Sequence, residues 1–156
     1  MPYRNATICL NGHVVSPSKS NAETFCSQCG NKTYSVCPQC NSPIRGLYDV
    51  EGVVVVGHRD YQKPYYCYNC GSPYPWTQKI LDNAVELLSL DDELDSSSKE
   101  LIKSAIPDLI VDTPTTPIAI AKYRKGIANA GQIIKDSLRQ LLIDVISKTA
   151  KKTLFP

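Results

Sequence analysis

Four short motifs between residues 9 and 70 decide the fold: CLNGH at 9–13, CSQC at 26–29, CPQC at 37–40 and CYNC at 67–70. Each motif places two metal-ligating side chains three or four residues apart. Together they supply seven thiols and one imidazole, which complete two four-ligand tetrahedral sites. Thiolate and imidazole ligands in fours favour Zn²⁺, with iron as the main competitor. The expected ligands are Cys9, His13, Cys26, Cys29, Cys37, Cys40, Cys67 and Cys70.

Disulfide bonds are the alternative use of these cysteines. An odd count of seven cysteines leaves one thiol without a partner, and CxxC pairs are rarely structural disulfides. The sequence also shows no secretory signal ahead of the first motif, which a protein of an oxidising compartment needs. We therefore expect reduced cysteines that bind two structural zinc ions, in a cytoplasmic protein.

The flanks of the motifs indicate which motifs share an ion. The second and fourth motifs each follow an aromatic residue and precede a glycine, as with Phe25 and Gly30 or Tyr66 and Gly71. Glycine allows a left-handed turn that directs amides toward the thiolates. If these two motifs close their sites, the first motif pairs with the second and the third with the fourth. The alternative is a cross-braced arrangement, in which the first and third motifs share one ion.

The length of the chain and its turn-rich first half predict an α+β protein with two regions. In 156 residues we expect a double zinc-ribbon domain at 1–76, followed by a helical domain at 77–156. The ribbon region is too rich in turns to bury a large apolar core. Zinc must therefore supply folding free energy, roughly 10 kcal/mol or more per site. No run of about 18 apolar residues is present, so we expect no membrane span.

Hydrophobic spacing and capping residues predict four helices, at 78–90, 98–105, 118–129 and 132–150. Thr77 is expected to cap the first helix. Pro107 is expected to end the second, which leaves an extended connector rich in Pro and Thr at 107–117. In the ribbon region, the run Val53–Val56 is expected to form a strand.

The last predicted helix carries a wide apolar face, formed by Ile134, Leu138, Leu141, Leu142, Val145 and Ile146. This face predicts either a homo-oligomer that assembles through the C-terminal helices or packing inside the helical domain. The charges are also divided, because residues 77–117 have three Lys against nine acidic residues, whereas 118–156 have eight Lys or Arg against two. The two segments either pair with each other or leave the basic end for phosphate.

Several longer segments carry a family resemblance: CLNGHVV, FCxxCG, CPxC, GVVVVG, CxNCGxPYPWT and DLIVDTPxTP. On these segments the sequence resembles a family of small bacterial zinc-ribbon proteins of largely unknown function, and the resemblance extends over nearly the whole chain. The resemblance implies a zinc-ribbon fold and bound metal. The layout is also similar to that of zinc-finger ribonucleases of anti-phage defence, which viral protein assemblies switch on. That similarity implies RNA as a partner and a protein as the trigger.

The catalytic prediction concerns one loop, His58-Arg59-Asp60, with Tyr61 and Lys63 beside it. The expected zinc sites are closed, with four protein ligands each, so a zinc-bound water is not expected to act. RNA can be cleaved without metal, because its 2′-hydroxyl is an internal nucleophile that needs a base, an acid and a cation. In this loop the imidazole would move the proton, the guanidinium would contact the phosphate and the carboxylate would orient the imidazole. An ordinary solvated loop is the alternative.

The nine tyrosines of the chain lie mostly in the ribbon region, interleaved with Arg and Lys side chains. They include Tyr61, Tyr65, Tyr66, Tyr68 and Tyr74, and Tyr48 lies near Arg45 in the same region. Such mixtures stack on the bases of single-stranded RNA, whereas the alternative is that the tyrosines form the ribbon core. The sequence therefore favours a zinc-ribbon protein that acts on RNA, as a regulated, metal-independent ribonuclease of bacterial anti-phage defence. The alternative is a non-catalytic adaptor that binds protein or nucleic acid and assembles through its helices.

Overall fold

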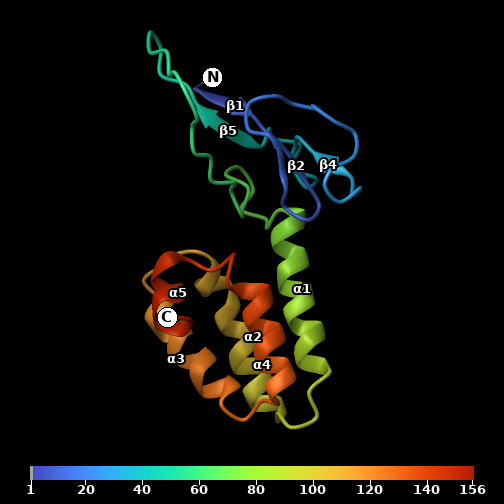
Figure 1. The fold of residues 1–156 in the computed structure, drawn as a ribbon, viewed down its shortest axis with the longest axis vertical. Coiled ribbons are helices and arrows are strands. Elements are labelled where there is room, and N and C mark those ends of the chain that lie inside the picture. Colours follow the sequence, from blue (N-terminus) through green and yellow to red (C-terminus); the bar gives the residue numbers. More distant parts are fainter. Residues whose placement is uncertain (1) are drawn as a thin grey trace. The chain divides into compact units, whose positions relative to one another are not determined.

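The computed structural model describes residues 2–156. Contacts within the chain divide it into two compact units, with the boundary between Lys79 and Ile80. The first unit consists of short strands and turns, and the second is helical (Figure 1). This confirms the α+β class and the order of a zinc-binding region followed by helices. No helix in the described part of the chain is both long and apolar enough to cross a membrane.

Five strands of two to four residues form two small antiparallel sheets in the first unit. In the larger sheet the central strand is β2 (Thr7–Cys9), which ends at Cys9, so this strand delivers the first metal ligand. The smaller sheet pairs the start of the chain with the residues just after the third motif. The strands are β1 (Tyr3–Asn5), β2 (Thr7–Cys9), β3 (Val14–Ser16), β4 (Thr33–Tyr34) and β5 (Arg45–Tyr48).

The apolar core of the first unit is small and includes cysteine side chains. Its buried members are Ala6, Ile8, Cys37, Ile44, Cys67, Tyr74 and Trp76. The rings of Tyr74 and Trp76 are stacked, with their centroids 4.8 Å apart, and the indole N–H of Trp76 donates to the Pro64 carbonyl at 3.0 Å. Because this core is small and contains ligand residues, we expect the fold of this unit to depend on metal.

Helix α1 (Pro75–Ser89) begins earlier than the sequence predicted. Thr77 lies within its first turn, and its hydroxyl donates to the Tyr65 carbonyl at 2.7 Å. The prediction that Thr77 caps the helix was therefore wrong. Proline at the first helical position explains the earlier start, because its fixed φ suits a helix and its missing N–H would have had no partner there.

The predicted strand at Val53–Val56 is absent from the structure. These residues lie in a loop between β5 and α1, and all four valines are exposed. A valine run has high β propensity, but a strand needs a neighbour for its N–H and C=O groups. The described chain places none beside this run, so propensity alone did not produce a strand.

The second unit is made of helices that bury aliphatic side chains. Besides the end of α1, these are α2 (Ser96–Ile110), α3 (Thr116–Ile127), α4 (Gln132–Leu142) and α5 (Lys148–Leu154). Helices α2 and α3 pack closely, and Gly126 is the reason they can. A Cβ at residue 126 would lie 2.5 Å from Cγ1 of Ile102, so any larger residue would force the two helices apart.

Pro107 does not end α2, which runs three residues further to Ile110. The prediction that an extended connector starts at residue 107 was wrong for this reason. A proline inside a helix costs roughly 3 kcal/mol through its missing N–H and its ring. Here the apolar spacing continues past the proline: Leu109 and Ile110 are both buried. Their burial offsets that cost, because each buried aliphatic side chain contributes about 1.5–3 kcal/mol.

The predicted helix at 132–150 is two helices, α4 and α5, separated by a turn at 143–147. Ser147 caps α5, since its side-chain oxygen accepts from the Ala150 N–H, and its own N–H donates to the Leu109 carbonyl at 2.8 Å. Four residues of the predicted apolar face are buried within this unit: Ile134, Leu138, Leu142 and Ile146. Packing inside the unit thus covers this part of the face, and a homo-oligomer through these helices stays a prediction.

Asp91 is a buried carboxylate that ties the turn after α1 to the start of α4. It accepts hydrogen bonds from the backbone N–H groups of Gly131 at 3.0 Å, Glu93 at 2.6 Å and Leu94 at 3.3 Å. These bonds, that of Gly131 foremost, lower the pKa of Asp91 below its ordinary value. The carboxylate is therefore held in its charged form and stabilises the helical unit at neutral pH.

Candidate metal centres

Each of the three CxxC motifs folds into the same tight turn, which we call a knuckle. In the knuckle at Cys26, the Gly30 N–H donates to the Cys26 carbonyl at 2.7 Å, and the Cys26 N–H donates to the Asn31 carbonyl at 2.8 Å. The knuckles at Cys37 and Cys67 repeat both bonds with the residues at the same offsets. The repetition follows from the spacing of the motif: two cysteines three residues apart fall on one side of such a turn.

A left-handed residue follows the second cysteine of every knuckle: Gly30 (φ 74°), Asn41 (φ 60°) and Gly71 (φ 72°). Glycine adopts this conformation without steric cost, and asparagine is the side chain that tolerates it best. The third knuckle therefore has the same backbone as the other two. Asn41 stands where the other two knuckles have a glycine, and the backbone conformation at that position is the same.

The first candidate site is formed by Cys9, His13, Cys26 and Cys29. The Cys9 Sγ lies 3.6 Å from the Cys29 Sγ and 3.5 Å from Nδ1 of His13. Nδ1 of His13 is also 3.7 Å from the Cys26 Sγ. The ligands come from the end of β2, the turn after it and the knuckle before β4. A three-stranded sheet thus brings the first and second motifs together.

The second candidate site is formed by Cys37, Cys40, Cys67 and Cys70. Here the Cys37 and Cys70 sulfurs are 3.7 Å apart, and those of Cys40 and Cys67 are 3.6 Å apart. Two knuckles face each other across this site. The motifs are therefore grouped in sequential order, and the cross-braced alternative does not describe the structure.

The two groups fit tetrahedral zinc. A Zn–S bond of about 2.3 Å requires neighbouring sulfurs about 3.8 Å apart, with a slightly shorter edge to an imidazole nitrogen. The observed edges have these lengths, and all four ligand atoms of each group lie within 4.8 Å of one another. All seven cysteines are free of disulfides. The chain thus contains two structural zinc sites, as the sequence predicted, and both have four protein ligands.

Each site combines buried and solvent-facing thiols whose pKa values differ. Burial raises the pKa of Cys9, and it raises that of Cys37 to about 11. Hydrogen bonds lower the pKa of Cys29 to about 5, chiefly through the Asn31 backbone N–H, and that of Cys40 to about 6, chiefly through the Ser42 side chain. Zn²⁺ bound at these sites would hold the buried thiols as thiolates and offset the cost of their burial.

Lys63 adds a positive charge beside the first site. Its half-buried ammonium group donates to the Gly12 carbonyl at 2.7 Å, within the turn that separates Cys9 from His13. Burial lowers the pKa of Lys63, while the charge of the Cys9 thiolate raises it. The sequence placed Lys63 beside the catalytic loop, but its contacts lie at the metal site, where its charge offsets that of the thiolates.

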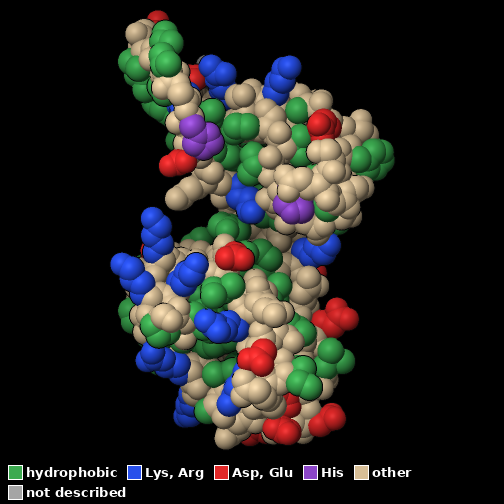
Figure 2. All heavy atoms as spheres, viewed as in Figure 1, with side chains coloured by type: hydrophobic (Ala, Val, Ile, Leu, Met, Phe, Trp, Pro, Cys, Tyr) green, Lys and Arg blue, Asp and Glu red, His purple; other side chains and the backbone are tan. Residues whose placement is uncertain are grey.

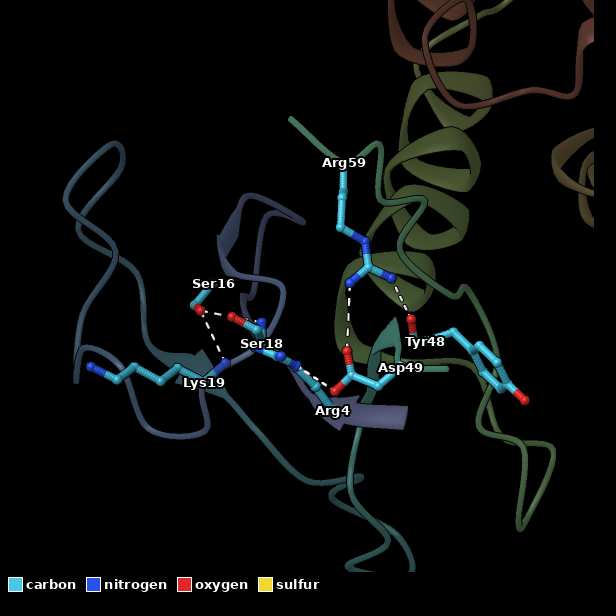
Figure 3. A network of polar contacts seen from close by, with 7 residues as sticks. All are labelled: Arg4, Ser16, Ser18, Lys19, Tyr48, Asp49 and Arg59. Atoms are coloured by element: carbon cyan, nitrogen blue, oxygen red, sulfur yellow. Dashed lines mark hydrogen bonds and ion pairs between the residues drawn. The ribbon is translucent and has the colours of Figure 1, made fainter. Parts of the chain in front are cut away.

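The loop His58-Arg59-Asp60 brings together two of its three predicted catalytic side chains. Nε2 of His58 is 3.5 Å from Oδ1 of Asp60, and both side chains are at least 90% exposed. Arg59 is engaged elsewhere: it donates to the Tyr48 carbonyl and lies 3.5 Å from Asp49, which also binds Arg4 at 2.6 Å (Figure 3). Arg59 therefore connects the loop to β5, and its guanidinium is not free as the catalytic prediction required.

A second group of side chains forms what we call the tyrosine–arginine face: Tyr3, Arg45, Tyr48 and Tyr68. The Arg45 guanidinium lies 4.4 Å from the Tyr3 ring centroid and 4.0 Å from that of Tyr68. The rings of Tyr3 and Tyr48 meet edge to face at 5.0 Å. All four residues are exposed. Cross-strand pairing of β1 with β5 sets this arrangement, because Tyr3 is opposite Tyr48 in the register.

Two hollows border the tyrosine–arginine face. One, of about 160 Å³, is lined by Tyr3, Arg45 and Tyr68 together with Pro2 and Pro43. The other, of about 370 Å³, is lined by Tyr3, Arg45, Tyr48, Arg59 and Asp60. The sequence had singled out Arg45, Tyr48 and Tyr68 but not Tyr3, whose place beside them depends on strand pairing. Of the other tyrosines named from the sequence, Tyr74 is buried in the core.

Residues 2–154 match the family described as "uncharacterized protein conserved in bacteria", DUF2321. The chain belongs to this family. The match covers both units and includes all eight metal ligands, as the resemblance noted from the sequence implied. No curated protein and no solved structure matches the chain.

Proposed function

We propose that this zinc-binding protein binds single-stranded RNA on the tyrosine–arginine face. The observation that carries the proposal is the exposed Arg45 guanidinium between the rings of Tyr3 and Tyr68. Unpaired bases stack on aromatic rings and on guanidinium planes, at about 1–3 kcal/mol per base. The two hollows that Tyr3 lines offer room for bases splayed out from a strand.

The helical unit supports the same proposal through its charge. Residues 118–156 carry eight Lys or Arg and two acidic residues. Figure 2 shows Lys and Arg side chains gathered on the surface near α3 and α5. A basic surface attracts the phosphate backbone without reading its sequence. Stacking on the first unit carries the proposal, and phosphate contacts on the second unit would add affinity without sequence preference.

Fluorescence anisotropy with a labelled, unstructured RNA tests this proposal. Arg45→Ala and Tyr68→Ala should each weaken binding about tenfold or more, the effect expected from loss of one stacking partner. Phe25→Ala is the matched control, because Phe25 is an aromatic residue, 62% exposed, in the same unit but outside the face. A duplex of the same sequence should bind more weakly than the single strand, and all binding should weaken as salt rises.

Equal RNA affinity in wild type, Arg45→Ala and Tyr68→Ala would remove the face from the proposal. If the zinc-loaded wild type binds no RNA at all, the adaptor function, with a protein as the bound partner, becomes the better account. Zinc content measured on every variant shows that the fold of the first unit is intact in each comparison.

RNA cleavage is a second candidate, favoured by the position of Asp60. This residue lines the same 370 Å³ hollow as Tyr3 and Arg45, and it is the partner of His58. In metal-independent cleavage, His58 takes the proton of a 2′-hydroxyl and the freed oxygen attacks the adjacent phosphorus. The bond to the 5′-oxygen then breaks, and that oxygen takes a proton from an acid or from water. The resemblance to trigger-activated ribonucleases of anti-phage defence adds support and assigns the activation to a viral protein assembly.

Cleavage is tested with zinc-loaded protein in buffer without magnesium, so that the structural metal stays in place. His58→Ala should slow cleavage roughly 100-fold or more, the usual effect of losing a general acid or base, while RNA affinity stays at the wild-type value. Gln28→Ala is the control, because Gln28 is an exposed residue of the same unit that lines neither hollow. Unchanged cleavage in His58→Ala would exclude this loop from the chemistry.

A further inference from the structure

The second unit contains a hollow of about 200 Å³, which we call the helical hollow, between side chains of α3, α4 and the end of α5. Its apolar lining consists of Tyr123, Ile127, Leu154 and Phe155. The rings of Tyr123 and Phe155 meet edge to face, with their centroids 6.4 Å apart. The hollow therefore belongs to one unit and offers an aromatic surface to a planar group.

Three cationic side chains also line the helical hollow: Arg124, Lys135 and Arg139. None of them forms an ion pair with a carboxylate of residues 2–156. Asp136 lines the hollow too, but its Oδ1 accepts a hydrogen bond from Nε2 of Gln132 at 2.9 Å. Three cations and one carboxylate give the lining a net charge of +2, which attracts an anion.

Contacts inside the unit hold two of these cations in place. One terminal nitrogen of Arg124 donates to the Thr153 carbonyl at 2.7 Å. The Arg139 guanidinium lies 5.7 Å from the ring centroid of Phe155. A guanidinium has five N–H donors, so the one bond of Arg124 leaves other donors for a ligand. Side chains that are already positioned lose less conformational entropy when an anion binds.

Tyr123 gives a second, independent indication of a ligand. Its side chain lines the helical hollow, and the residue is only 3% exposed. Its hydroxyl has no hydrogen-bond partner within the described part of the chain, and burial raises its pKa to about 12. Buried hydroxyl groups nearly always have a partner. An oxygen acceptor of a ligand in the hollow would supply the one that Tyr123 lacks.

We propose that the helical hollow binds a nucleoside monophosphate, with its phosphate at the three cations and its base against the aromatic lining. A phosphate monoester carries a charge of about −1.5 to −2 at pH 7, which matches the charge of the lining. Guanidinium groups bind phosphate oxygens through paired N–H donors, and bases stack on aromatic rings. The hollow is smaller than the roughly 300–1,000 Å³ of sites for drug-sized ligands, so it suits a single nucleotide.

Two sources share this ligand chemistry: a free nucleotide and the 5′-phosphorylated end of an RNA strand. The proposal is independent of the tyrosine–arginine face, because every residue that lines the helical hollow lies in the second unit. RNA binding by the first unit can therefore fail while nucleotide binding by the second unit is retained.

Isothermal titration calorimetry of the zinc-loaded full chain with adenosine 5′-monophosphate (AMP) tests the proposal. We expect a dissociation constant on the order of 10–1,000 µM, the range for a small ligand in an open site. Adenosine lacks the phosphate and ribose 5-phosphate lacks the base, so each should bind at least several-fold more weakly than AMP.

Three variants locate the binding site. Arg139→Gln should weaken AMP binding about tenfold or more, because it removes charge-assisted hydrogen bonds to the phosphate. Tyr123→Phe should weaken it several-fold without lowering the melting temperature, since the hydroxyl has no partner in the free protein. Lys152→Gln is the matched control: Lys152 is an exposed cation in the last turn of α5 that does not line the hollow.

Competition with RNA separates the two sources of the ligand. If RNA with a 5′-phosphate displaces AMP and the same RNA with a 5′-hydroxyl does not, the ligand is a strand end. If neither RNA displaces AMP, the ligand is a free nucleotide. Equal displacement by both RNAs would contradict the proposal, because phosphates of the RNA backbone would then suffice.

Three further results would overturn the proposal. The first is a wild type that binds no AMP at millimolar concentration. The second is an equal loss of affinity in Arg139→Gln and Lys152→Gln, which would indicate general attraction to a basic surface. The third is equal affinity for AMP and for adenosine or ribose 5-phosphate, which would show that phosphate and base are not recognised together.

Discussion

The zinc-binding unit and the helical unit are nearly equal in length but are stabilised by different interactions. The first has strands of two to four residues and a core whose members include Cys37 and Cys67. The second has helices of up to 15 residues and an aliphatic core around Leu109, Leu138 and Leu142. Small units bury too little apolar surface to fold on that basis alone, and metal ligation supplies the difference. The comparison indicates that a chelator should unfold the first unit and leave the second folded.

Removal of zinc is the sharpest way to break the comparison. A strong chelator should unfold the first unit, because each structural zinc site contributes roughly 10 kcal/mol or more of folding free energy. Trp76, the one tryptophan of the chain, is buried in that unit and reports its unfolding by fluorescence. The helical circular dichroism signal should stay near its original value. Loss of both signals at the same chelator concentration would mean that the helical unit also depends on metal.

Leu138→Ala should destabilise the helical unit by about 2–5 kcal/mol, the cost of a cavity at a fully buried leucine. Zinc content and Trp76 fluorescence should not change at moderate denaturant concentrations. Ile133→Ala on the same helix is the matched control, since Ile133 is 80% exposed and surface changes usually stay within about 0.5 kcal/mol. Zinc loss in Leu138→Ala would show that the two units are coupled.

A smaller effect should appear in the pH dependence of the helical unit. The Gly131 N–H and two other backbone donors lower the pKa of Asp91 in the folded protein. A depressed carboxyl pKa contributes stability above the unfolded value, and this stability is lost as pH falls through the folded value. Asp91→Asn should therefore be less stable than wild type in urea at pH 7, and the difference should shrink at acid pH.

Asp92→Asn is the control for this measurement, because Asp92 is the exposed neighbour of Asp91. Its midpoint of urea unfolding should equal that of the wild type at both pH values. The stability difference between wild type and Asp91→Asn could instead be the same at neutral and acid pH. That result would mean that Asp91 acts through its shape and not through its charge.

The zinc sites were predictable because the motifs are local. The spacing of two ligands within each motif determines a knuckle whatever surrounds it, and eight donors divide into two complete sets. Gly30 and Gly71, which follow the second and fourth motifs, favoured the sequential grouping of the motifs. Asn41 after the third motif adopts the same left-handed conformation, which the absence of a glycine there did not indicate. The helical unit was predicted in outline for a similar reason, since hydrophobic spacing is also local.

The remaining features depend on contacts between distant residues, which sequence spacing does not reveal. Pro107 stays inside α2 because Leu109 and Ile110 are buried beyond it. The valine run forms no strand because the described chain offers it no neighbour. Tyr3 joins Arg45 and Tyr68 only because β1 pairs with β5, and Arg59 turns to Asp49 across ten residues of sequence. Candidate binding and catalytic residues fall in this class, so the sequence named several of them and missed Tyr3 and Asp49.

Native mass spectrometry of the freshly purified full chain tests the central claim most directly, because it counts metal ions per molecule. The account predicts two zinc ions in the wild type, since two complete sets of four ligands are present. Cys67→Ser should retain only the ion held by Cys9, His13, Cys26 and Cys29. A wild-type mass with one zinc ion, with none or with an iron–sulfur cluster would contradict the account.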